Sequence, residues 1–318
     1  KKHRASTLLA APGKIAVSDQ YVAISDTLHH RVILADHQGK VLQVFGGLEP
    51  GSHDGNAADS RFNSPQGLAF TEKGLYVADT GNHLIRYIDL VSASVTTIVG
   101  NGKLERFRAG VFNAEHVGLA SPWGLAVDDA RLYIAMAGSH QVWVFDAMTG
   151  KVSIYAGSGD EGIADGDLHT ATFSQPSGLS VSGDWLYIAD AEDSAIRRID
   201  LKNELVETIV GTGLFDFGDV DGEFQRARLQ HVLGVTVYDH DTLYIADTYN
   251  HKLKLVDLQN SQVKSLMDNG TIQLNEPGGL AVFDNAILIA DTNNHRIVFY
   301  DLESGDAKQW PLFFPLTD

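Results

Sequence analysis

The chain has 318 residues, of which 44% are hydrophobic, and 41 acidic against 24 basic side chains give it a formal charge of -17 at pH 7. So acidic a chain repels phosphate backbones and anionic membrane surfaces, which makes nucleic acid a poor candidate partner. The absence of cysteine excludes disulfides, thiolate metal sites and dithiol redox chemistry within this chain, and no apolar run approaches the length of a membrane span.

The chain begins with the basic stretch Lys1-Lys2-His3-Arg4 and not with Met. Such a start indicates a piece of a longer chain, or a processed one. We therefore expect residues 1–11 to lead in from a missing upstream segment, and residues 12–318 to form the folded unit.

Six copies of one unit fill the rest of the chain. The clearest copy contains the stretch Leu75-Tyr76-Val77-Ala78-Asp79-Thr80. Its Asp position recurs at residues 26, 79, 136, 190, 247 and 291, and we call these the marker positions. A period of roughly fifty residues is typical of propeller blades and not of helical repeats.

Each unit contains four short segments with strand character, which in the second unit cover residues 67–70, 75–78, 85–89 and 95–99. They are β-branched and aromatic, they are bounded by Gly, Pro, Asn and Asp, and none keeps a helical period. One four-stranded sheet cannot cover both of its own faces, so the units must pack side by side. The sequence predicts an all-β fold: a six-bladed β-propeller with four antiparallel strands per blade. The last blade is expected to supply its own fourth strand near residues 307–310.

Four connections between units are long, at residues 46–65, 100–122, 157–176 and 211–232. Three contain an Asp-Gly step and then an apolar anchor; the steps are Asp54-Gly55, Asp165-Gly166 and Asp221-Gly222, and the anchors are Phe62, Phe173 and Leu229. A turn that uses Asp as a cap and Gly at positive φ explains this pattern. The alternative is a calcium site made of hard oxygen ligands, although no loop has the twelve-residue EF-hand pattern. Its candidate ligands are Asp165, Asp167, Asp219 and Asp221, with Asp160 nearby.

A histidine stands four residues after the marker position in five units, and a serine stands there in the fourth: His30, His83, His140, Ser194, His251 and His295. Zinc requires donors within about 2 Å of the metal, whereas packed sheets are about 10 Å apart. These side chains therefore cannot converge on one ion, and we expect them to form hydrogen bonds between blades. The Asp-Thr pairs at 26–27, 79–80, 247–248 and 291–292 are expected to cap turns by bonding nearby amides.

The third unit departs from the repeat, because Met136-Ala137 replaces Asp-Thr and two tryptophans stand at positions that are smaller or non-aromatic elsewhere. Exposed Met and Trp are typical of adaptable binding surfaces, so these residues indicate such a surface. The alternative is that they pack in the core. The candidate ligand- or partner-binding residues are Trp123, Met136, His140, Trp143, Phe217, Asp219 and Asp221.

No catalytic motif is present: the chain lacks a Gly-x-Ser-x-Gly elbow, a His-Glu-x-x-His pair and a phosphate-binding Gly-x-x-x-x-Gly-Lys. The preferred interpretation is a non-enzymatic ligand- or protein-binding module that needs no cofactor, with calcium as the one candidate ion. The alternative is a lactonase-like, metal-dependent hydrolase or lyase acting at the channel mouth, because propeller enzymes gather single residues from several blades. RNA binding would need a basic, aromatic rim, for which Lys103, Arg106 and Arg108 offer only a local patch.

The repeated Pro-x-Gly-Leu-Ala-Val and Leu-Tyr-Ile-Ala-Asp-Thr-x-Asn-His-Arg-Ile patterns resemble the NHL repeat over essentially the whole chain. Residues 12–14, 62–67, 134–143 and 217–222 more specifically resemble the propeller of thioredoxin-like/NHL fusion proteins, the NHL-repeat-containing protein type two family. This resemblance implies an upstream thioredoxin-like domain ahead of Lys1, a protein or small-molecule partner at the long-loop face, and a soluble, cytoplasmic module. Gluconolactonase-type propellers and the amidating lyase are less similar, and their metal residues have no matching positions here.

Overall fold

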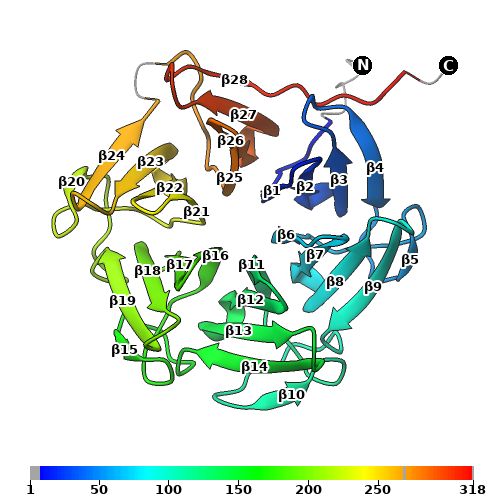
Figure 1. Ribbon diagram of the computed structural model, residues 1–318, viewed down its shortest axis with the longest axis horizontal. Helices are drawn as coiled ribbons and strands as arrows, with labels where there is room; N and C mark the ends of the chain where they lie inside the picture. Colours follow the sequence, from blue (N-terminus) through cyan, green and yellow to red (C-terminus); the bar gives the residue numbers. More distant parts are fainter. Residues whose placement is uncertain (1–7, 268–269, 317–318) are drawn as a thin grey trace, which may run out of the picture.

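The computed structural model describes residues 8–267 and 270–316. Its regular structure consists of antiparallel strands with 3-10 turns of three residues between some of them. Six sheets stand around a central axis as the blades of a propeller (Figure 1), which confirms the predicted fold. Over the two described ranges, the chain has no helix that is both long enough and apolar enough to cross a membrane.

The strands follow the repeat in chain order. In the first three blades they are β1 (Ile15–Val17), β2 (Val22–Asp26), β3 (Arg31–Ala35), β4 (Val41–Gly46), β5 (Gly55–Asn56), β6 (Leu68–Phe70), β7 (Gly74–Asp79), β8 (Leu84–Asp89), β9 (Ser94–Val99), β10 (Val111–Asn113), β11 (Pro122–Asp128), β12 (Arg131–Met136), β13 (Gln141–Asp146) and β14 (Lys151–Ala156). In the last three they are β15 (Gly166–Asp167), β16 (Pro176–Ser182), β17 (Trp185–Asp190), β18 (Ala195–Asp200), β19 (Leu205–Val210), β20 (Gly222–Glu223), β21 (Gly234–Asp239), β22 (Thr242–Asp247), β23 (Lys252–Asp257), β24 (Gln262–Leu266), β25 (Gly279–Phe283), β26 (Ala286–Asp291), β27 (Arg296–Asp301) and β28 (Ala307–Gln309).

Side-chain alternation along each second strand joins a blade to both of its neighbours. On β7, Leu75 and Val77 pack into the apolar cluster shared with the first blade, while Tyr76 and Ala78 pack into the one shared with the third. Successive side chains of a strand point to opposite faces, so a run of apolar residues serves two interfaces. A cluster of this kind lies at each of the six seams, including the seam between the last and first blades.

The four long connections add a strand that the sequence analysis did not predict. Each of β5, β10, β15 and β20 pairs with the outer strand of the blade that its connection leads into, so four sheets have five strands and two have four. The fourth strand of a blade has an unpaired outer edge, and such edges invite pairing with other chains. A long connection covers this edge before it turns inward to begin the next inner strand.

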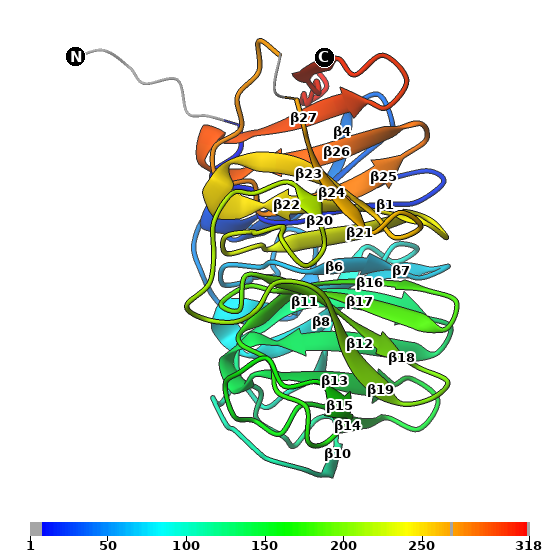
Figure 2. The same ribbon diagram turned by 90° about the vertical axis from the view of Figure 1, so that its left-hand side faces the viewer.

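Strand direction divides the connections between two faces of the ring (Figure 2). The turns that join second to third strands, and the connections between blades, lie on one side, which we call the loop face. Five of these turns contain a 3-10 turn: η1 (Thr27–His29), η2 (Thr80–Asn82), η3 (Ala137–Ser139), η4 (Thr248–Asn250) and η5 (Thr292–Asn294). The tight turns from first to second and from third to fourth strands lie on the other side, which we call the turn face.

The ring closes between the sixth and first blades, where β28 confirms the expected fourth strand of the last blade. Trp310, directly after β28, is 5% exposed and belongs to the cluster between these two blades, as does Leu9. Beyond it, the amide of Val41 donates to the Phe313 carbonyl at 2.9 Å, and the amide of Phe313 donates to the Gly39 carbonyl at 2.9 Å. The C-terminal segment thus bonds the first blade beside β4. Of the lead-in expected over residues 1–11, residues 1–7 lie outside the described range.

Trp310→Ala should destabilise the fold by about 3–5 kcal/mol, because it removes a large buried side chain from the closing seam. Urea unfolding monitored by circular dichroism measures the change. Leu316, which is 95% exposed in the same segment, supplies the matched control, since Leu316→Ala should leave the midpoint unchanged. A loss below about 1 kcal/mol for Trp310→Ala would show that this segment does not hold the ring closed.

Candidate functional site

The loop face carries a ring of hydrogen bonds across the six seams. At five seams the Nδ1 atom of a histidine accepts an amide hydrogen from the next blade at 2.9–3.1 Å; the donors to His30, His83, His140, His251 and His295 are Ser64, Ser121, Gln175, Glu276 and Ala11. At the remaining seam, Ser194 Oγ accepts the His231 amide hydrogen at 3.0 Å. The predicted inter-blade role is confirmed, and each histidine serves its own seam.

This role requires a neutral imidazole, because a protonated ring has no acceptor nitrogen. The pKa of His83 lies below its ordinary value, mainly because of burial and also because Arg106 is nearby. Low pH therefore opposes the bond at this seam.

The Asp-Thr pairs fasten blades in two directions. The threonine hydroxyl donates to the carbonyl of a proline that opens the next blade, at 2.6 Å for Thr80 and Pro122 and at 2.8 Å for Thr248 and Pro277. The marker aspartate accepts an amide hydrogen from the chain that enters its own blade, sixteen residues earlier in the case of Asp79 and Asn63. The prediction that these pairs cap turns by bonding nearby amides is wrong: the aspartates make no side-chain cap bond to the 3-10 turns that follow them, and the amides that they bond lie on distant segments.

Three blades contain a buried ion pair between the marker aspartate and a cation on the third strand. Both partners are fully buried in Asp79–Arg86 at 2.8 Å, Asp190–Arg197 at 3.0 Å and Asp247–Lys254 at 3.0 Å. Burial raises the pKa of Asp79 and Asp247 above the ordinary value, while Arg86 and Lys254 act in the opposite direction. An unpaired charge at these depths costs several kcal/mol, so the cation and the aspartate depend on each other.

The Asp-Gly steps supply a second carboxylate to each of these cations. Asp54 bonds Arg86 at 2.6 Å and also accepts from the amide and hydroxyl of Thr97, on the outer strand of the blade. Asp165 bonds Arg197 at 2.9 Å and Thr208 in the same way. These aspartates therefore fix the extra strand to the blade, which agrees with the turn interpretation. The predicted anchors Phe62, Phe173 and Leu229 are fully buried.

The calcium candidates are engaged with cations or stand apart. Asp219 bonds Lys252 at 2.6 Å and Lys254 at 2.8 Å, and Asp221 accepts from Ser265. Burial opposes ionisation of Asp219, but the two lysines outweigh it and hold the pKa of Asp219 below its ordinary value.

The other two calcium candidates lie apart from these: Asp167 is exposed, and Asp160 pairs with Arg108. Within residues 8–267 and 270–316, no three His, Cys, Asp or Glu side chains are grouped so as to hold a metal ion. Calcium stays a prediction, for which Arg197 or Lys254 would have to be displaced.

The third blade replaces the buried ion pair with a neutral pair. Met136 and Trp143 occupy the positions of Asp79 and Arg86, and both are fully buried. The thioether Sδ of Met136 accepts the Ala120 amide hydrogen at 3.3 Å, which is the bond that the marker aspartate makes in other blades. These two side chains are therefore not exposed, and the core-packing alternative holds for them.

The extra strand of this blade covers the neutral pair. The Trp143 ring stacks on Phe112 with centroids 5.8 Å apart, and its Nε1 donates to Gln141 at 3.0 Å. Phe107 lies 6.3 Å from the same ring. Aromatic packing therefore stabilises this position in the third blade, whereas a buried ion pair occupies it in the second and fourth blades.

The remaining candidates do not form one site. Trp123 is half-buried at the start of β11, close to the channel, and His140 is bonded at its seam. Phe217 is 53% exposed in the connection between β19 and β20, beside Phe215, which is 96% exposed. In Figure 1 that connection lies at the outer edge of the fifth blade, away from the channel. The basic patch is dispersed too, since Arg108 pairs with Asp160 and Arg106 donates to the Gly138 carbonyl.

The fourth blade carries a carboxylate where three other blades have an amide side chain. Asn82 and Asn250 donate to the marker aspartate of their blades at 2.7 and 2.8 Å. The corresponding residue here is Asp193, which is fully buried, and neither of its oxygens has a hydrogen-bond partner among the described residues. The pKa of Asp190 is raised well above its ordinary value, mainly by burial, with Arg197 opposing and Asp193 adding to the shift.

The central channel contains a cavity of about 280 Å³, lined by the inner strands of all six blades. Five blades place a glycine at the same level of its wall: Gly67, Gly124, Gly178, Gly234 and Gly279. The strands approach so closely that a Cβ on Gly67 would lie 2.1 Å from the Trp123 carbonyl oxygen, and one on Gly178 would lie 2.6 Å from that of Leu233. Side chains are therefore excluded at these positions.

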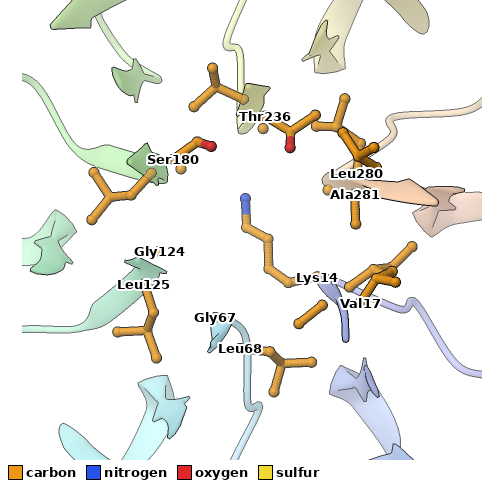
Figure 3. A pocket seen from close by; sticks show the side chains of 18 of the residues that line it. Lys14, Val17, Gly67, Leu68, Gly124, Leu125, Ser180, Thr236, Leu280 and Ala281 are labelled. Carbon is orange, nitrogen blue, oxygen red and sulfur yellow. The ribbon is translucent and has the colours of Figure 1, made fainter. Parts of the chain in front are cut away.

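The sixth position of this level holds Lys14, which the sequence analysis did not single out. Its side chain crosses the channel (Figure 3), and its amine donates to the Leu233 carbonyl. The sequence contains the signal, because Pro12-Gly13-Lys14 aligns with Pro65-Gln66-Gly67 and with the other proline-led starts. A lysine at a position that is glycine in the five other repeats distinguishes this site from the rest of the ring.

The comparisons with known proteins agree with this architecture. A sequence profile described as "NHL repeat" matches residues 62–86, 119–145 and 274–300. The chain is 39% identical to "NHL repeat-containing protein 2" of Gallus gallus over 88% of its length, and 38% identical to the Homo sapiens protein of that name. It spans 44% of the length of these relatives. It is also 38% identical to "Protein SUPPRESSOR OF QUENCHING 1, chloroplastic" of Arabidopsis thaliana, over 89% of this chain and 29% of that protein.

Solved structures share the fold at low sequence identity. The propeller in "Crystal structure of Nidogen/Laminin Complex" superposes with a TM-score of 0.62 at 15% identity, covering 91% of this chain and 92% of that one. "Streptogramin B lyase structure" gives a TM-score of 0.59 at 11% identity, covering 97% of this chain and 85% of that one. These similarities concern the six-bladed architecture alone.

Met136→Asp should destabilise the protein by about 3–5 kcal/mol, because it buries a carboxylate without its cation. The double variant Met136→Asp/Trp143→Arg rebuilds the pair of the second blade and should recover at least about 1 kcal/mol relative to the sum of the single changes. A double-mutant cycle by urea unfolding gives this coupling energy. A coupling of zero would mean that the two positions do not act as a pair.

Asp193→Asn should stabilise the protein at pH 7 by about 1–3 kcal/mol, because the amide can donate to Asp190 as Asn82 does to Asp79. The folded-state pKa of Asp190 is raised above its unfolded value, so its contribution to stability is complete below the ordinary carboxyl range and is lost as pH rises through the folded-state pKa. The advantage of the variant should therefore be larger at pH 8 than at pH 4. Unfolding at both pH values tests this, with exposed Asp184→Asn as the control, and an advantage that is equal at both would contradict it.

Proposed function

Because this chain is an NHL-repeat propeller related to NHL repeat-containing protein 2, we propose that it is a non-enzymatic binding module that holds a partner protein at its loop face. The observation that carries this proposal is the pair of exposed aromatic side chains, Phe215 and Phe217, in the connection between β19 and β20. Val220 in the same connection is 46% exposed. Exposed apolar groups of this kind are typical of interaction sites.

The other long connections support the proposal by contrast. They bury their aromatic residues against their own blades: Phe62 and Phe173 are fully buried, and Phe112 packs on Trp143. Only the connection before the fifth blade, among the residues described, turns two phenylalanines outward. Its exposed aromatic surface therefore has no counterpart in the repeat.

Hydrogen bonds hold this connection in place. Arg228 forms an ion pair with Asp216 at 2.9 Å, and the backbones of Val220 and Arg228 bond each other in both directions. Hydrogen bonds from Arg228 and Thr212 keep the pKa of Asp216 below its ordinary value. A fixed loop loses little entropy when a partner binds, which favours affinity.

The channel lends no support to the metal-dependent hydrolase or lyase alternative. The described residues that line the cavity include Ser180, Thr236 and Lys14 but no Asp, Glu or His. Carboxylates and imidazoles are the ligands that a catalytic divalent ion requires.

A thioredoxin-like domain is the first partner to test, since the sequence resembles proteins that join such a domain to this propeller. Isothermal titration of the propeller with the thioredoxin-like domain of a fusion protein should detect binding, and Phe215→Ser/Phe217→Ser should weaken it at least tenfold. The matched control is Val91→Ser/Met148→Ser, which removes two exposed apolar side chains from the turn face. The proposal fails for this partner if the wild-type propeller does not bind it, and for this surface if both double variants bind equally.

A further inference from the structure

Lys14 is the one buried cation of the described chain that lacks a carboxylate. Four cationic side chains are buried, at 9% exposure or less: Lys14, Arg86, Arg197 and Lys254. The other three each bond a fully buried aspartate of their own blade at 2.8–3.0 Å. Of the residues that the structure describes, the Lys14 amine bonds only the Leu233 carbonyl, although an ammonium has three hydrogens to donate.

We propose that the central channel binds a small monocarboxylate, and that the ligand's carboxylate pairs with the Lys14 ammonium. This site is separate from the surface around Phe215 and Phe217, and the inference does not depend on the function proposed above. The ligand supplies the negative charge that Asp79, Asp190 and Asp247 supply to the other buried cations.

The wall of the channel is built to admit the lysine. A Cβ on Gly279 would lie 3.0 Å from Lys14 Cα and 3.1 Å from Lys14 Cδ, so the absence of a side chain there gives the lysine its space. The glycines on the other four inner strands keep the rest of this level open. The result is one long polar side chain in a cavity large enough for a ligand of a few heavy atoms beside ordered water.

Among residues 8–267 and 270–316, Lys14 is the only ionisable residue that lines the cavity. The lining residues from β6, β11, β16, β21 and β25, and from Ile15 to Val17 on β1, are glycines, aliphatic residues, Ser180 and Thr236. On the adjacent strand β2, the carboxylate of Asp26 is already bonded to Arg31 at 2.7 Å and His29 at 2.8 Å. Within the described part of the chain, an anion that enters the channel therefore meets Lys14 as its only charged partner.

The surroundings favour a carboxylate with a short apolar chain. The amine points toward the part of the wall that holds Ser180 and Thr236 (Figure 3). Ser180 accepts the Val237 amide hydrogen at 3.0 Å, which leaves its own hydroxyl hydrogen to donate. Leu68, Leu125 and Leu280 offer apolar contact on other sides. A multiply charged anion such as sulfate would lose its hydration for a single cation, whereas one carboxylate is neutralised by it.

Ligand binding is linked to protonation of the lysine. Burial lowers the pKa of Lys14 to about 7. A carboxylate beside the amine stabilises the charged form and raises this pKa, so the complex takes up a proton wherever the free amine is neutral. Affinity is then nearly constant below pH 7 as long as the ligand itself stays ionised, and it falls as pH rises above 7. Between pH 6 and pH 8 the protonated fraction of the free lysine drops about tenfold.

Butanoate is the probe, and the full chain labelled with 13C at lysine Cε reports both occupancy and charge by NMR. Butanoate should shift the Lys14 signal toward the protonated position at pH 8 and bind about tenfold more weakly at pH 8 than at pH 6. Saturation-transfer NMR of butanoate should show contact with the wild-type protein and with Lys264→Met, which removes an exposed lysine of β24. Lys14→Met should abolish that contact.

Three results would overturn the proposal: butanoate leaves the Lys14 signal unchanged at both pH values, Lys14→Met retains the saturation transfer, or chloride and sulfate shift the signal at the same concentration as butanoate. The last result would show a general counter-ion in place of a carboxylate ligand. Should Lys14→Met fail to fold, the wild-type signal and its dependence on pH and on the anion still decide the question. Loss of partner binding in the Phe215→Ser/Phe217→Ser variant should leave these signals unchanged.

Discussion

Every blade of this ring is apolar on both faces, and only its two neighbours can cover them. The pairing of Leu75 and Val77 with one seam, and of Tyr76 and Ala78 with the other, shows how a single strand meets that demand. Closing the circle brings the inner strands so close together that five of the six have room only for glycine at one level of the channel. The histidine bonds then satisfy the amides that the close approach would otherwise leave unpaired between blades. The contacts that close the ring therefore also hold the loop face and the channel rigid.

Most buried charges in this protein follow one pattern of pairing, and the third blade, Asp193 and Lys14 depart from it. A buried arginine or lysine meets a marker aspartate from its own sheet and a second carboxylate from the incoming connection. The third blade replaces charge with Met136 and Trp143, which shows that packed neutral side chains can substitute for a buried ion pair. In the fourth blade, Asp193 is a buried carboxylate whose oxygens have no hydrogen-bond partner among the described residues. In the channel, Lys14 is a buried cation that bonds a carbonyl and no carboxylate.

The period of the repeat predicted the blades, and the shared position of the five histidines predicted the inter-blade bonds, since a residue that recurs at the same place in successive blades has the same structural role in each. Other features escaped because they depend on where segments meet. The extra strands beginning at Gly55 or Gly166 are too short to show a pattern and form only against an outer edge. From the sequence, Met136 and Trp143 are candidates for exposure, because composition does not reveal that Phe112 packs on the Trp143 ring. Lys14 lies within an aligned sequence motif, but only the structure shows that its side chain enters the channel at the level of the five glycines.

The main chain itself crosses five of the six seams, and each crossing connects two blades covalently. The seam between the sixth and first blades has no such crossing, and Leu9, Trp310 and the Phe313 bonds close it by noncovalent contacts alone. Tension applied to the two ends of the propeller would therefore act first on the contacts at this seam and would leave the other five seams unloaded. A force transmitted through Leu9 would reach this seam directly, and it would strengthen or weaken the closure of the circle.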